Sequence, residues 1–145
     1  MNKKEYAVQG KKNRAAGVRF EAKVRSNLED MGWIVDKWSN TVDSHKSNIL
    51  RLVPAKRKYN PFKKIMVIGT GFPDFVAFKR KQDKKEYEVV GIEVKMKGYL
   101  DKIEKDMCRW LLENKVFSKI LIAKAVKEGR KINVEYIDFA KKYAE

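Results

Sequence analysis

Hydrophobic and polar positions follow a helical period in two stretches of the chain. In residues 15–31, apolar residues return every three or four positions and form one stripe, which predicts an amphipathic helix. Gly32 follows directly, where a left-handed residue commonly ends a helix. Residues 100–114 show the same spacing beside Asp101, a favourable N-cap. The two stripes are Phe20, Val24, Leu28 and Met31, and Leu100, Ile103, Met107, Trp110, Leu111 and Asn114.

The other hydrophobic residues gather in short runs rich in β-branched and aromatic side chains, a pattern typical of strands. Residues 1–13 have no sustained period and are interpreted as a basic flexible arm. Residues 40–72 are interpreted as a basic insertion, with a polar loop at 40–48 and a basic turn at 54–61. The order of elements predicts an α/β fold with a mixed central sheet flanked by helices. The expected strands are residues 33–38, 49–53, 65–68, 74–78, 87–95, 118–126 and 132–137.

Composition narrows the class of protein. The chain has 145 residues, which suits a single domain, and its 34 Lys and Arg against 19 Asp and Glu give a formal charge of +15. A lone cysteine, Cys108, excludes an internal disulfide and a cysteine zinc cluster, and we expect it to be buried. No apolar run is long enough to span a membrane, and the N-terminus lacks the apolar segment of a signal peptide. We therefore expect a cytoplasmic protein without a membrane partner.

The positive charge is concentrated in two segments. Residues 1–25 and residues 40–72 each carry a formal charge of +6. Heat-adapted proteins also have lysine-rich surfaces, but there the acidic residues rise with the lysines, as they do not here. We expect a polyanionic partner, most simply DNA, although charge alone does not separate DNA from RNA. The expected phosphate contacts are Lys11, Lys12, Arg14, Arg19, Lys56, Arg57, Lys58, Lys63 and Lys64.

A few charged residues lie in or beside predicted strands. Glu93 and Lys95 share one face of the strand at 87–95, and Asp74 begins the strand at 74–78. Pairing of these strands through the charged link between them would bring Asp74 beside Glu93. Two neighbouring carboxylates repel each other unless a proton or a cation joins them, and Mg²⁺ prefers carboxylate oxygens. The alternative is a surface ion pair between Glu93 and Lys95, and the positive charge of the chain favours the metal site.

At these positions the sequence resembles the PD-(D/E)XK nuclease superfamily. Pro73-Asp74 is similar to the first signature of the superfamily, and Glu93-Val94-Lys95 is similar to the second. Residues 17–21 (Gly-Val-Arg-Phe-Glu) resemble the start of the first helix in archaeal Holliday-junction resolvases and related viral and repair nucleases. The resemblance covers about residues 14–138 and implies a restriction-endonuclease-like core in the order α-β-β-β-α-β.

The resemblance also implies a set of site residues around Mg²⁺, with Mn²⁺ as an alternative. Glu21 falls at the border of the predicted apolar stripe, which suits either a metal ligand or an ordinary boundary glutamate. Where relatives often carry a supporting glutamine, this chain has Glu104, which either supports the site or faces solvent on the second helix, and we favour the solvent-facing interpretation. The implied metal ligands are Glu21, Asp74, Glu93 and the main-chain carbonyl of Val94, and the implied catalytic lysine is Lys95.

Together these expectations describe a magnesium-dependent endodeoxyribonuclease that hydrolyses phosphodiester bonds in DNA. The resemblance implies 5′-phosphate products, a homodimer, and a branched or Holliday-junction substrate in DNA recombination or repair. The lysine-rich, glutamine-poor composition suits a heat-loving archaeon or one of its viruses. Two alternatives stay open: a non-catalytic DNA-binding protein on a nuclease-like fold, and a restriction-type endonuclease that recognises a sequence. His45, the only histidine, is expected in a loop and gives poor support for a zinc site.

Overall fold

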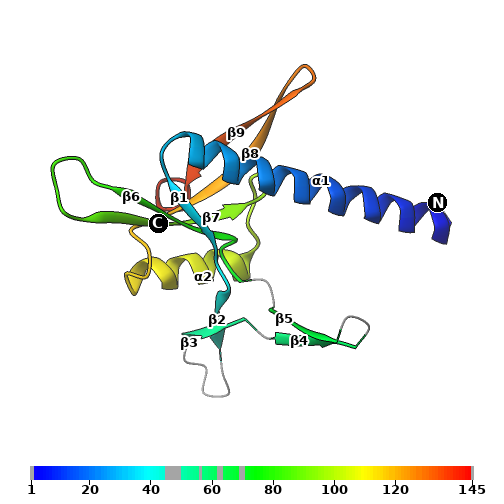
Figure 1. Cartoon of the computed structure of the whole chain (residues 1–145), viewed down its shortest axis with the longest axis horizontal. Helices are drawn as coiled ribbons and strands as arrows, with labels where there is room; N and C mark the ends of the chain where they lie inside the picture. The colour runs from blue at the N-terminus through cyan, green and yellow to red at the C-terminus, as the bar shows by residue number, and fades with distance from the viewer. Residues whose placement is uncertain (1, 45–49, 56, 62–63, 69–70, 145) are drawn as a thin grey trace.

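The computed structural model describes residues 2–44, 50–55, 57–61, 64–68 and 71–144. Its central feature is a five-stranded sheet in the order β1-β6-β7-β8-β9, in which β7 and β8 are parallel and the other neighbours are antiparallel. The predicted α/β class with a mixed sheet is therefore confirmed (Figure 1). The sheet strands are β1 (Ile34–Lys37), β6 (Phe75–Arg80), β7 (Tyr87–Val94), β8 (Lys119–Glu128) and β9 (Lys131–Asp138), and the helices are α1 (Lys3–Asp30), α2 (Lys102–Glu113) and α3 (Phe139–Lys142).

The two long helices pack against opposite faces of this sheet (Figure 1). Phe20, Val24 and Leu28 are the buried residues of α1, as the spacing predicted. Met31 departs from the predicted stripe: it is 44% exposed, because it caps the helix end beyond the last buried turn. Successive side chains of a strand point to opposite faces of the sheet, and this alternation along β6 places Phe75 in the cluster under α1.

The cluster on the other face forms around α2. Cys108 is fully buried there, as expected, together with Leu111. All three tryptophans are partly buried and pack at the edges of the two clusters. Asp101 caps α2, as predicted, and forms a capping box with Glu104: each main-chain N–H is bonded by the other residue's side chain. The capped first turn of α2 lies close to the end of β7, where Lys95 contacts Glu104.

The N-terminal segment differs from the prediction. Residues 3–13, expected as a flexible arm, are the first turns of α1, which begins with a capping box between Asn2 and Glu5. Nearly every residue in these turns is exposed, and Figure 1 shows this part of the helix projecting beyond the sheet. The hydrophobic pattern gave no signal because this half of the helix buries no stripe.

The insertion also contains more order than predicted. The expected loop at 40–48 contains β2 (Asn40–Ser44), which pairs with β3 (Leu50–Pro54), and the expected basic turn contains β4 (Arg57–Asn60), which pairs with β5 (Ile65–Ile68). Beyond β5, Gly71 has no room for a side chain, because a Cβ there would lie 2.3 Å from the main-chain oxygen of Trp38. This contact fixes the path from the insertion into β6.

No helix in the described ranges is long and apolar enough to cross a membrane.

Candidate active site

The pairing of β6 with β7 brings two carboxyl groups together. The register places Phe75 opposite Ile92, so Asp74 and Glu93 adjoin at the end of the same ladder. The main-chain N–H of Asp74 donates to Glu93 Oε1 at 3.2 Å, and the main-chain N–H of Val94 donates to Asp74 Oδ2 at 2.8 Å. The predicted neighbourhood of Asp74 and Glu93 is therefore confirmed, and both side chains are held by backbone donors.

Glu93 is the one charged residue that is buried among the residues that the structure describes, with 5% of its surface exposed. Burial, followed by the hydrogen bond and the charge of Asp74, raises the pKa of Glu93 to about 10. A divalent cation acts in the opposite direction, because its charge favours the ionised form.

Lys95 lies beside this pair, as its alternation along the strand predicted. Its Nζ is 3.8 Å from Glu93 Oε2 and 2.6 Å from Glu104 Oε2. Burial alone would lower the pKa of Lys95, but the hydrogen bond to Glu104 and the charges of Glu93, Glu104 and Asp74 outweigh it and raise the pKa above its usual value. The lysine is therefore held as an ammonium group.

The position of Glu104 differs from the expected one. We interpreted it as solvent-facing, but its side chain is only 14% exposed and binds Lys95. Its other oxygen, Oε1, accepts the main-chain N–H of Asp101 in the capping box at 3.0 Å. A glutamate three residues after an aspartate N-cap was the available signal for this geometry, because a capping box fixes the side chain at the helix start.

Glu21 reaches the same region from α1. A cavity of about 360 Å³ is lined by Arg14, Glu21, Asp74, Val94 and other residues. The carboxylate of Glu21 already forms an ion pair, because its Oε1 accepts a hydrogen bond from the Nζ of Lys37 on β1. Glu93 does not line the cavity. Among the described residues, no group of three His, Cys, Asp or Glu side chains is close enough to hold a metal ion.

The donor set nevertheless suits a hard divalent cation. Asp74 and Glu93 provide adjacent carboxylate oxygens, and burial of Glu93 beside Asp74 raises its pKa, which the charge of a cation would lower. Asp74 faces the cavity, so water and a phosphate have access to one of the two carboxylates. The third implied ligand, Glu21, lines this cavity but is bound to Lys37. The residues present therefore fit a cation at Asp74 and Glu93, with Glu21 as a further ligand only if it leaves Lys37.

The expected phosphate contacts fall in two places. Lys11, Lys12 and Arg19 are exposed on α1, Arg14 lines the cavity beside Asp74, and Lys64 is exposed in the turn before β5. Arg57 and Lys58 belong to β4. Lys56 and Lys63, together with His45, lie outside the described residues.

Comparison with known proteins gives this chain no relative: no family model matches it, and no curated protein or solved structure matches it significantly.

Proposed function

We propose that this protein is a metal-dependent endonuclease that hydrolyses phosphodiester bonds in DNA. The observation that carries the proposal is the joining of Asp74, Glu93 and Lys95 at one end of the β6–β7 ladder. Two adjacent carboxylates repel each other unless a cation or a proton joins them, and an ammonium group beside them on a chain of formal charge +15 suits an anionic substrate.

The metal would be held by Asp74 and Glu93, with Mg²⁺ as the expected ion and Mn²⁺ as an alternative. When bound, such an ion supplies Lewis acidity and makes a water molecule a better nucleophile. The main-chain carbonyl of Val94 and the carboxylate of Glu21 are the further ligands implied by the resemblance described above. The Val94 N–H bond to Asp74 keeps that carboxylate in place.

Lys95 performs the second task in this proposal. Its ammonium group donates hydrogen bonds to the attacking water and to the phosphate oxygens, where negative charge grows as water attacks phosphorus. The bond from phosphorus to the 3′-oxygen then breaks and leaves a 5′-phosphate product. Glu104 does not touch the phosphate in this scheme; it orients Lys95 through their 2.6 Å contact.

The restriction-endonuclease-like core is part of the proposal. It is supported by the order of α1, β1, β6, β7, α2 and β8, and by the position of the signature residues where β6 and β7 meet. A homodimer acting on branched DNA or Holliday junctions follows from the same resemblance and is proposed with it.

Cleavage of labelled DNA tests the proposal. Purified protein is incubated with linear, nicked and four-way DNA and with single-stranded RNA, in Mg²⁺ and in EDTA. We expect DNA products with 5′-phosphates in Mg²⁺ only, with the four-way DNA cut fastest. Discrete fragments from plasmid DNA would instead identify a restriction-type enzyme.

One observation favours a second candidate, a non-catalytic DNA-binding protein. Glu21 is engaged by Lys37, and three carboxylates do not meet within the described part of the chain. DNA binding without any metal-dependent product would support this candidate and overturn the endonuclease.

A further inference from the structure

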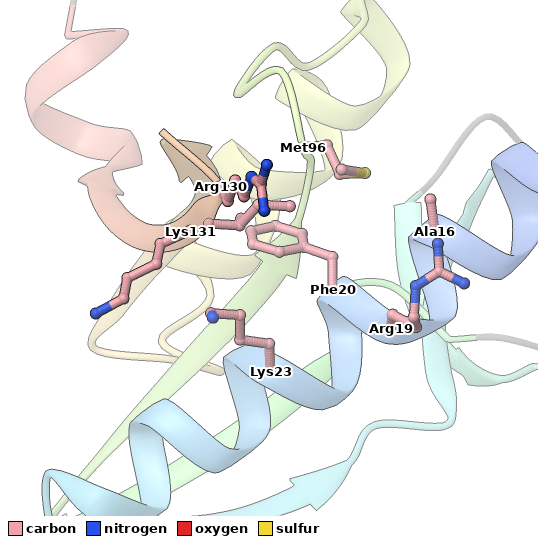
Figure 2. A pocket seen from close by; sticks show the side chains of 8 residues that line it. Ala16, Arg19, Phe20, Lys23, Met96, Arg130 and Lys131 are labelled. Carbon is pink, nitrogen blue, oxygen red and sulfur yellow. The ribbon is translucent and has the colours of Figure 1, made fainter. Parts of the chain in front are cut away.

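A second cavity lies next to the candidate active site. It has a volume of about 400 Å³ and is formed between α1 and the turn that joins β8 to β9. Figure 2 shows the Arg130 guanidinium close to the Phe20 ring, while the side chains of Lys131 and Arg19 extend to either side. Two of the cavity's basic residues, Arg19 and Lys23, come from α1, and the other two, Arg130 and Lys131, come from the turn and the first residue of β9.

These four cations have no anionic partner in the described part of the chain, where none of them forms an ion pair or a side-chain hydrogen bond. All four side chains are also exposed to solvent. Like charges gathered without a counter-charge repel one another and create a positive potential, which attracts an anion. A phosphate group is the anion that best matches guanidinium and ammonium groups together.

The floor of the cavity is apolar. Phe20, Met96 and Ile132 contribute to its lining, and the Phe20 ring occupies the middle of the view in Figure 2. Phosphate alone would gain nothing from such a floor. A nucleotide offers both surfaces, because its base packs against apolar or aromatic groups while its phosphate binds cations.

The position of this cavity relates it to the candidate active site. Met96 lines both cavities, and consecutive residues in the same turns of α1 line them as well: Gly17 and Glu21 line the first, and Ala16 and Phe20 line the second. A strand whose phosphate lies at Asp74 therefore has its neighbouring nucleotides within reach of the second cavity. In a paired duplex the bases are stacked inside the helix and cannot enter it.

We propose that this cavity binds an unpaired nucleotide next to the scissile phosphate, and that the protein therefore prefers DNA with unpaired bases at the cleavage site. The inference rests on the proposed function, because it takes the substrate to be DNA at Asp74. It goes further by assigning Lys23, Arg130 and Lys131 to substrate binding and by naming the structural feature of the DNA that is recognised.

Binding to two DNAs of equal length and charge tests the proposal in EDTA, where no cleavage is expected. One is a paired duplex, and the other has one end unpaired by mismatches and carries 2-aminopurine there. The double variant Arg130→Ala/Lys131→Ala is compared with Lys84→Ala/Lys85→Ala, which removes the same charge from the distant β6–β7 turn. Thermal melting of each variant confirms that it is folded.

We expect the cavity variant to bind the unpaired DNA about 10-fold more weakly, with a salt slope reduced by roughly 1.4 for two lost phosphate contacts. Its affinity for the duplex should fall no more than that of the control. Ile132→Ala, which keeps the charges, should weaken binding of the unpaired DNA several-fold without changing the salt slope, and should reduce the change in 2-aminopurine fluorescence.

Equal losses on both DNAs would show contacts to the backbone only and overturn the proposal, as would losses equal to those of the control. The endonuclease proposal is judged separately. If cleavage is absent while the difference in binding persists, the endonuclease fails and the nucleotide cavity stands. If cleavage occurs without the difference in binding, only the cavity proposal fails.

Discussion

The two cavities along α1 share a wall but differ in their chemistry. Beside the first, acidic groups and Lys95 are bonded to one another or to the backbone, and Glu93 is buried. In the second, four exposed cations have no partner in the described part of the chain. Charges that are buried and bonded are held in one geometry, as catalysis requires. Exposed cations without partners create a positive potential that attracts an anionic ligand, as binding requires. Variants in the first cavity should therefore change rate, and variants in the second should change affinity.

The largest effect is expected at the first cavity. Asp74→Ala or Lys95→Ala should lower the rate of DNA cleavage by about 10³-fold or more, because each removes a group that binds the cation or stabilises the developing charge. DNA affinity should stay nearly unchanged. Single-turnover cleavage and fluorescence polarisation measure the two quantities.

Two controls accompany this experiment. Asp74→Asn keeps an acceptor for the Val94 N–H and separates the loss of charge from a loss of structure. Lys97→Ala removes an exposed lysine close in sequence to Lys95 and should cut normally. Cleavage at the normal rate by Asp74→Ala or Lys95→Ala would show that the assignment of that residue is wrong.

The next effect is on metal-dependent stability. At a free Mg²⁺ concentration 100-fold above Kd, binding stabilises the folded protein by about 2.7 kcal/mol, which raises Tm by roughly 5–10 °C. Glu93→Gln keeps the size of the side chain and an acceptor for Asp74 N–H, but removes the negative charge. Calorimetry should show the Mg²⁺-dependent shift in the natural protein and its loss in the variant. A shift retained by the variant would place the metal elsewhere.

A smaller effect is expected at Glu104, which we assign as a positioning residue. Glu104→Ala should lower kcat about 10-fold and leave DNA affinity unchanged, because Lys95 loses the partner that orients it. Glu104→Gln keeps a single acceptor oxygen, which can serve either Lys95 or the Asp101 N–H but not both, so it should recover only part of the rate. Glu113→Ala, at the exposed end of α2, serves as the control. A glutamine variant as fast as the natural protein would show that Glu104 does not position Lys95.

The smallest effect concerns Lys37. The ion pair with Glu21 is partly exposed, so it contributes little stability. If Glu21 is a metal ligand, Lys37→Gln frees it and should raise Mg²⁺ affinity about 3-fold, measured by isothermal titration calorimetry. Lys85→Gln makes the same change of charge in a remote turn. An unchanged affinity would remove Glu21 from the ligand set.

The sequence predicted those features that depend on local pattern. Asp74 lies beside Glu93 because a short charged link joins the two strands that carry them. Glu93 and Lys95 lie on the same face because side chains alternate along a strand. The buried stripe of Phe20, Val24 and Leu28 follows in the same way from the period of a helix.

Features that depend on distant contacts were missed. Glu104 turns inward because the start of α2 lies against the end of β7, and Lys37 meets Glu21 because β1 packs beside α1. The first turns of α1 were missed for another reason: they are helical without a buried face, so no hydrophobic period marks them. The expected strands at 49–53 and 65–68 are present as β3 and β5, but their partners β2 and β4 were missed because polar residues interrupt the alternation expected of strands.

The capping box of α2 has a consequence for dynamics. Glu104 uses one oxygen to close the first turn of the helix and the other to hold Lys95. Fraying of that turn and release of the lysine are therefore one local opening event rather than two. Hydrogen exchange at the Glu104 amide, whose proton is bonded to Asp101, reports how often the opening occurs.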